Sequence, residues 1–141
     1  MVTREDVVNF LNRMELEFEE VEEGMWLAYP GGRNGETPVV ISHAPPLLVF
    51  RMKVLDVPHD GEKCTQLYRR LLEANASEMV HAAYGLEEDD VILTESLEVE
   101  NLDFNEFQAT VDSFQMAAAQ HMETLAPFRD CREPSQPAAQ A

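Results

Sequence analysis

Histidines are the first side chains in this sequence that could do chemistry, as metal ligands or as general bases. They lie at four positions that share no metal-binding spacing: His43, His59, His81 and His121. No local motif places a serine or cysteine nucleophile beside any of them. A site assembled only by folding is the alternative, because catalytic triads are spatial. From the missing nucleophile, metal and cofactor motifs we expect no catalytic residue, no metal, no cofactor and no enzyme activity.

The cysteines, the acidic stretches and the glycine-rich loop also lack the spacing of a metal, disulfide or phosphate-binding site. Cys64 falls in a helical pattern and Cys131 in a polar tail, so both are expected to be free thiols. The acidic stretch Glu15–Glu23 alternates as a solvated strand face, which points its carboxylates apart rather than around a cation. Glu87–Asp90 lacks the spaced ligands and glycine of a calcium loop. The loop at 30–35 lacks the phosphate-loop consensus.

The charge balance excludes several classes of partner. The 141 residues include 27 acids against 10 lysines and arginines, a formal net charge of −17. Phosphate backbones and anionic membranes would be repelled, so we expect neither nucleic-acid nor membrane binding. No run approaches the roughly 18 apolar residues of a membrane span, and no secretory signal follows Met1–Asp6. A cytoplasmic protein is therefore expected, with a charge that attracts basic partners.

Apolar residues spaced by three and four predict three helices that must position any binding surface. The last, over residues 102–125, is the longest, and its start is marked by a capping-box pattern at Asp103 and Glu106. The other two are predicted over residues 3–15 and 60–75, each beginning at a residue suited to cap a helix.

Six strands are predicted from alternating or continuous apolar runs. They cover residues 16–23, 25–29, 39–42, 47–57, 78–84 and 91–99. Pro38 predicts an edge strand after it, because proline cannot donate to a ladder. The order helix, four strands, helix, two strands, helix predicts an α+β fold, an antiparallel β-sheet with helices mainly on one face. We expect a single domain over residues 1–126 and a disordered C-terminal tail over 127–141.

Several predicted strands carry apolar residues on both sides, although a sheet with one face in water needs them only on the other face. On the second strand, the face away from the helices would carry either Trp26 or Met25. On the fourth strand, it would carry either Leu47 with Val49 or the residues that alternate with them. Such a face would be more apolar than a monomer surface usually is. We therefore expect it to be covered by a second copy of the chain, or by an extended segment of another protein added at the Pro38 edge.

With this element order, the sequence resembles the YbjN-domain family, whose fold is that of class I type III secretion chaperones. The resemblance runs from about Val7 to Leu125. It is carried by Trp26, Val57-Pro58, Leu71-Leu72-Glu73-Ala74-Asn75, Tyr84-Gly85-Leu86 with the acidic turn, and Leu102-Asp103. The resemblance implies a non-enzymatic, chaperone-like homodimer that holds an extended or unfolded segment of a partner protein, without ATP.

The candidate site residues are the positions that the strand and helix patterns had already identified. Predicted partner-binding residues are Trp26, Val39, Ile41, Leu47 and Val49. Predicted dimer contacts are Leu67, Leu71 and Tyr84. Each of them could instead be a core residue. The alternative functions are a regulatory module whose acidic surface engages a basic partner protein and, third, a small enzyme.

Overall fold

The chain forms one six-stranded antiparallel sheet with helices, as predicted for its α+β class. The computed structural model describes residues 1–33, 37–79 and 81–130. The helices are α1 (Arg4–Arg13), α2 (Gly61–Ser77), α3 (Phe104–Thr124) and α4 (Ala126–Asp130). The strands are β1 (Glu17–Glu22), β2 (Met25–Tyr29), β3 (Val39–Ala44), β4 (Leu47–Asp56), β5 (Ala83–Glu87) and β6 (Asp90–Glu98). Their order in the sheet is β1-β2-β3-β4-β6-β5.

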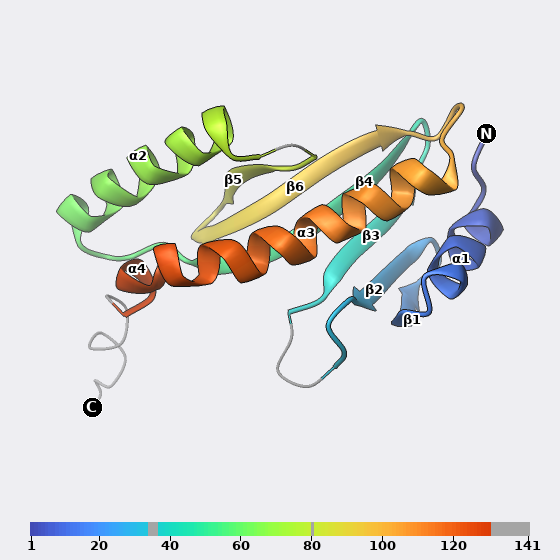
Figure 1. Ribbon diagram of the computed structural model, residues 1–141, viewed down its shortest axis with the longest axis horizontal. Helices are drawn as coiled ribbons and strands as arrows, with labels where there is room; N and C mark the ends of the chain where they lie inside the picture. The colour runs from blue at the N-terminus through green and yellow to red at the C-terminus, as the bar shows by residue number, and fades with distance from the viewer. Residues whose placement is uncertain (34–36, 80, 131–141) are drawn as a thin grey trace.

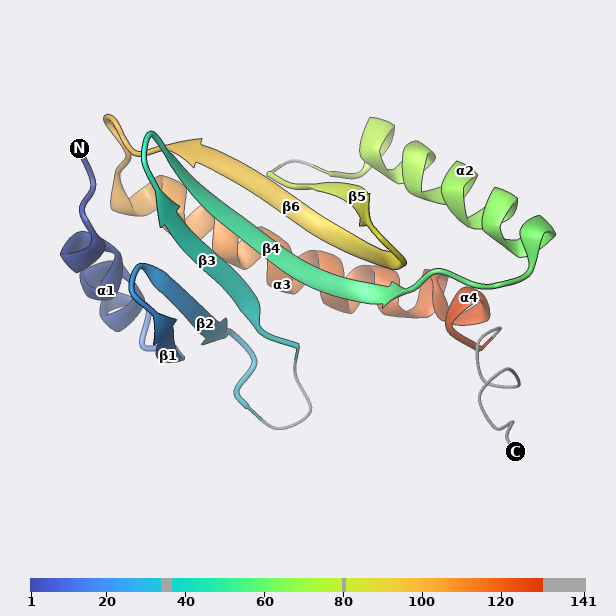
Figure 2. The same cartoon turned by 180° about the vertical axis from the view of Figure 1, so that it is seen from behind.

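Two helices cover one face of the sheet and leave the other face open. α3 crosses this face along the length of β4 and β6, and α1 lies over its β1–β2 end (Figure 1). From behind, β3, β4 and β6 lie in front of α3, and none of the described helices crosses them (Figure 2). α2 lies beside the β5 edge of the sheet rather than over its centre. The molecule therefore has a covered face, an open face and a helix at one edge.

The covered face holds the hydrophobic core. Trp26, Ile41 and Phe50 are direct neighbours across β2, β3 and β4, and all three are buried. The ring of Phe50 lies 5.6 Å from that of Phe107 and 6.2 Å from that of Phe114, both on α3. Burying each of these large side chains stabilises the fold by about 1.5–3 kcal/mol. The apolar stripe predicted on the last helix thus fixes α3 on the sheet.

Local capping interactions set the starts of the helices, as the sequence indicated. Thr3 Oγ1 accepts from the Asp6 N–H at 3.1 Å, and the Asp6 carboxylate accepts from the Thr3 N–H at 2.9 Å. Hydrogen bonds from Thr3 to the carboxylate, that from the Thr3 backbone N–H first, lower the pKa of Asp6. Asp103 and Glu106 make the same reciprocal pair before α3. Asp60 caps α2 by accepting a backbone N–H from its first turn.

The strand after Pro38 is not at an edge of the sheet, so that prediction was wrong. β3 pairs with β2 on one side and with β4 on the other. Pro38 stands just before the first residue of the strand, Val39, and therefore removes no hydrogen bond from either ladder. The edges of the sheet are β1 and β5.

The fifth strand is displaced along the sequence from its predicted position. Residues 78–84 were expected to form it, but β5 begins at Ala83 and continues through Gly85. The side chain of Asn75 fixes this start, because it donates to the Tyr84 carbonyl at 3.2 Å and accepts from the Tyr84 N–H at 2.8 Å. Sequence spacing gave no sign of this contact between α2 and β5.

The C-terminal part of the described chain is helical beyond the predicted domain boundary. α4 occupies the first residues of the predicted tail, and residues 131–141 lie outside the described part of the chain. Phe128 of α4 packs against the core. No helix among the described residues is long and apolar enough to cross a membrane.

Candidate protein-binding surfaces

The open face of the sheet carries a group of half-buried apolar side chains. We call this group the open-face patch, and its members are Met25, Leu27, Tyr29, Val40 and Val49. Leu27 and Val40 are direct partners across β2 and β3. Ser42, a polar residue of β3, lies between Met25 and Val49, so the group extends over β2, β3 and β4 with one polar position within it. An apolar group that crosses three strands and stays partly exposed is typical of a protein-binding surface.

The predicted partner-binding residues fall on both faces of the sheet. Val49 belongs to the open-face patch, and Leu47 lies at the end of the same face with 36% of its surface exposed. Trp26, Val39 and Ile41 are buried on the covered face instead. Placing Trp26 on one face with Leu47 and Val49 was therefore wrong, because α1 and α3 cover the side of β2 that carries the indole. Binding of a partner by any of the five stays a prediction.

A second apolar surface lies where α2 meets the β5 edge. We call it the α2–β5 patch, and it consists of Tyr68, Leu72 and Leu86, exposed by 36%, 68% and 52%. These residues surround a hollow of about 190 Å³ that Leu71 and Tyr84 help to line. Burial, the largest cause, raises the pKa of the Tyr84 phenol. The patch is open to solvent at one edge of the sheet.

The predicted dimer contacts lie beneath this patch rather than on its surface. Leu67, Leu71 and Tyr84 are all buried within the chain, and Leu67 is a core residue. The exposed positions of the patch were not among the predicted contacts. Tyr68 and Leu72 belong to the apolar side of the predicted helix. That side is wide, and its width was the sequence feature that could have indicated that part of it stays exposed. Leu86 had no signal, because it was expected in a turn.

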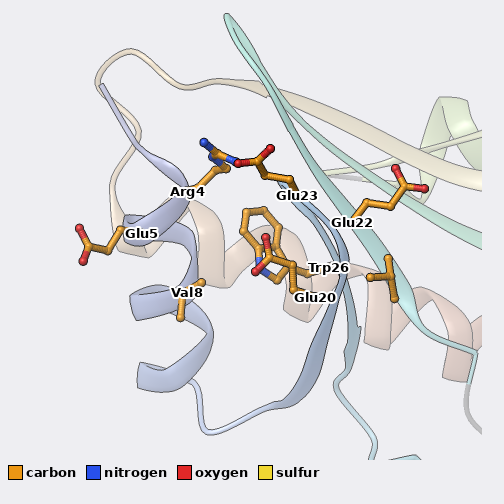
Figure 3. A pocket seen from close by; sticks show the side chains of 8 residues that line it. Arg4, Glu5, Val8, Glu20, Glu22, Glu23 and Trp26 are labelled. Carbon is orange, nitrogen blue, oxygen red and sulfur yellow. The ribbon is translucent and has the colours of Figure 1, made fainter.

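A third candidate is a pocket between α1 and the β1–β2 hairpin, which we call the hairpin pocket. It has a volume of about 630 Å³, and Trp26 lines it together with four glutamates and one arginine of α1 (Figure 3). Arg4 of α1 pairs with Glu23 of the hairpin at 2.7 Å. The turn of the hairpin is made by Gly24, whose φ of +80° favours glycine. The sequence had indicated this turn but not the pocket.

The side chains that could do chemistry do not converge in the described part of the chain. His43 Nε2 lies 3.0 Å from the Val2 carbonyl, and His59 and His81 are exposed. Cys64 Sγ donates to the Pro58 carbonyl at 2.8 Å. Among the residues that the structure describes, no group of three or more metal-ligating side chains comes together. The side chain of His121 and the whole of Cys131 lie outside that part.

A sheet covered on one face by helices also occurs in known proteins. The sequence model of the CesT_Tir_1 family matches residues 2–130 of the chain. The chain belongs to the CesT_Tir_1 family. Family and fold are those of non-enzymatic chaperones and protein-binding modules, in agreement with the expectation from the sequence motifs. No curated protein sequence matches the chain.

The fold is similar to those of several solved structures, among them type III secretion chaperones and YbjN. One is the heterodimeric ExoU–SpcU complex of Pseudomonas aeruginosa, with a TM-score of 0.62 and 12% identity over 79% of this chain and 91% of that chain. The Yersinia pestis type III secretion chaperone SycH gives a TM-score of 0.58 and 18% identity over 84% and 98%. YbjN from E. coli gives 0.61 and 15% over 86% and 92%. The resemblance seen in the sequence is confirmed.

Proposed function

We propose that this chain is a chaperone-like homodimer that holds an extended or unfolded segment of a partner protein without doing chemistry on it. The observation that carries the proposal is the open-face patch. Five apolar side chains across β2, β3 and β4 stay partly exposed although the covered face already supplies a complete core. An extended segment can cover such side chains with its own alternate residues, and β1, an edge strand of the sheet, offers backbone hydrogen bonds.

The α2–β5 patch is the proposed contact between the two copies. Leu72 and Leu86 expose apolar surface on a helix and on the neighbouring edge strand. A two-fold dimer uses the same patch on both copies, so α2 and β5 of one protomer would cover their counterparts on the other. Leu67, Leu71 and Tyr84 would then support the interface from below rather than touch the partner copy.

Light scattering with a measured molar mass tests the dimer. We expect the mass of two chains at tens of micromolar, and the mass of one chain for Leu72→Glu, because the new charge would be buried in the interface. Met116→Glu is the matched control, since Met116 is 67% exposed on α3, away from the patch. A wild-type chain that is monomeric at these concentrations would contradict the dimer.

Capture of a partner from the native lysate tests the open-face patch. We expect Val49→Lys to lose a partner that the wild-type chain retains, because a charge replaces an apolar contact on the open face. The control is Thr94→Lys, on the same face of the sheet but on β6, outside the patch. Equal loss with both variants would place the partner elsewhere. We also propose that this binding takes place in the cytoplasm, which cell fractionation tests.

The second candidate, a regulatory module that engages a basic protein, is favoured by the acidic β1 edge. Four of the six residues of β1 are glutamates, and all four are exposed. Salt separates the two functions. Electrostatic association should weaken several-fold as ionic strength rises, whereas contacts through the open-face patch should change little.

A further inference from the structure

We propose that the hairpin pocket receives an arginine or lysine of the bound partner segment, and so selects segments in which a cation stands among apolar residues. This inference rests on the proposed holding of an extended segment. It goes beyond that proposal because it states the chemistry of one position in the segment. Two independent features of the pocket support it, namely the charge of its rim and a buried donor in its floor.

The rim of the pocket is acidic on both sides. Glu5 comes from α1, and Glu20, Glu22 and Glu23 come from the β1–β2 hairpin. The only cation among the lining residues is Arg4, which is already paired with Glu23 at 2.7 Å. A second cation could therefore enter with an excess of carboxylates around it. In Figure 3 Glu20 lies in front of the indole and Glu23 reaches toward Arg4, whereas the carboxylates of Glu5 and Glu22 point outward. Carboxylates that outnumber the cations around a groove repel one another, and an entering guanidinium or ammonium relieves that repulsion.

The floor of the pocket contains an unused hydrogen-bond donor. Trp26 is 1% exposed, and its Nε1 has no acceptor among the described residues. An indole N–H that is buried without an acceptor is costly, so buried tryptophans usually find one. Figure 3 shows the indole between α1 and the hairpin, with the side chain of Glu20 in front of it. A carbonyl of the bound segment would supply the acceptor.

Glu20 controls access to this donor. It is the direct cross-strand partner of Trp26, and its carboxylate accepts from the Gly24 N–H at 3.1 Å. Because the indole nitrogen is itself covered, an acceptor reaches it only when a neighbouring side chain shifts. An entering cation attracts the Glu20 carboxylate and draws it away from the indole, so the charge and the hydrogen bond act together.

The walls of the pocket fit the stem of such a side chain. Val8 of α1 and Val21 of β1 line it, and Val21 is 45% exposed. Arginine and lysine carry apolar stems that lie along apolar surface while their charged ends stay with water or carboxylates. β1 is also an edge strand, so the backbone of the segment can run beside it. The pocket therefore suits a long cationic side chain better than a short or acidic one.

A pair of synthetic peptides tests the inference. The probe is acetyl-Val-Arg-Val-Arg-Val-amide, and the matched peptide replaces each arginine with neutral citrulline, which has nearly the same shape. Trp26 is the single tryptophan of the chain, so its indole gives one N–H signal in a nitrogen–proton spectrum. We expect the arginine peptide to shift that signal and to slow its hydrogen exchange. The citrulline peptide should bind about fivefold more weakly, as expected for two exposed ion pairs.

Variants separate the pocket from the overall negative charge. Glu22→Gln with Glu23→Gln should weaken the arginine peptide about fivefold. Glu100→Gln with Glu123→Gln changes the net charge equally, on exposed residues outside the pocket, and should leave binding unchanged. Equal binding of both peptides, equal effects of both double variants, or no binding would overturn the inference. A peptide that moves the signals of β2–β4 but not the indole would overturn it while supporting the proposed function.

Discussion

Asn75 shows how one side chain can fix the position of the next element along the chain. Its amide group bonds both backbone groups of Tyr84, and it is half-buried. We expect Asn75→Ala to lower the free energy of unfolding by about 1–3 kcal/mol, because the Tyr84 N–H and carbonyl lose this partner at a partly buried position. Urea denaturation measures the change. Asn105→Ala, at an exposed position on α3, is the control and should differ little from the wild-type chain.

Glu95 is a carboxyl group in a place that disfavours its charge. It pairs with Phe50 across β4 and β6 and is half-buried. Burial, only partly opposed by His81, raises the pKa of Glu95 above its ordinary 4.5. The folded chain therefore keeps this proton at pH values where the unfolded chain has lost it. Below the pKa of Glu95 in the unfolded chain, this residue leaves the free energy of unfolding unaffected. The free energy of unfolding falls as the pH rises from there through the raised pKa of Glu95 in the folded chain.

The expected outcome is that Glu95→Gln melts at a higher temperature than the wild-type chain near neutral pH. The difference should vanish below about pH 4, where both states of the wild-type chain are protonated. Melting curves across this range measure it. Glu98→Gln, an exposed position on the same strand, removes one charge without the burial and is the control. A gain of equal size in both variants would mean that net charge alone is responsible.

At the scale of elements, α3 is the helix on which the covered face depends. Phe114 is fully buried and contacts Phe50 of the sheet. We expect Phe114→Ala to destabilise the chain by about 3–5 kcal/mol, through lost burial and the cavity left behind. Met116→Ala, two residues along but 67% exposed, should stay within about 0.5 kcal/mol. Denaturant midpoints compare them, and equal effects would contradict the packing described for α3.

The elements also show how far local sequence signals reach. The capping pairs before α1 and α3, and the stripe on α3, were visible because they depend on residues three or four apart. The interior position of β3 and the start of β5 were not. The first depends on which strand pairs with β2, and the second on Asn75 of α2. Contacts between separate elements leave no periodic mark in the sequence.

At the scale of the whole molecule, the charge of −17 acts against compactness. The ion pairs seen among the described residues join side chains that are all at least partly exposed, so they contribute little each. We therefore expect the melting temperature to rise when sodium chloride is raised from about 0.02 to 0.3 M, because salt screens the repulsion. Potassium chloride should act alike. A fall in melting temperature would mean that the ion pairs outweigh the repulsion.

The sequence by itself determined the class of the fold, the order of its elements, the helix starts and the absence of a local catalytic motif. Those properties follow from spacing, composition and local hydrogen-bonding patterns. Tertiary structure alone decided which side of each strand faces the core. Alternation places Trp26 and Met25 on opposite faces of β2, but when both sides are apolar it does not say which side the helices cover. The packing of α1 and α3 put Trp26 inside, left Val49 on the open face, and created the hairpin pocket from residues that the sequence keeps apart.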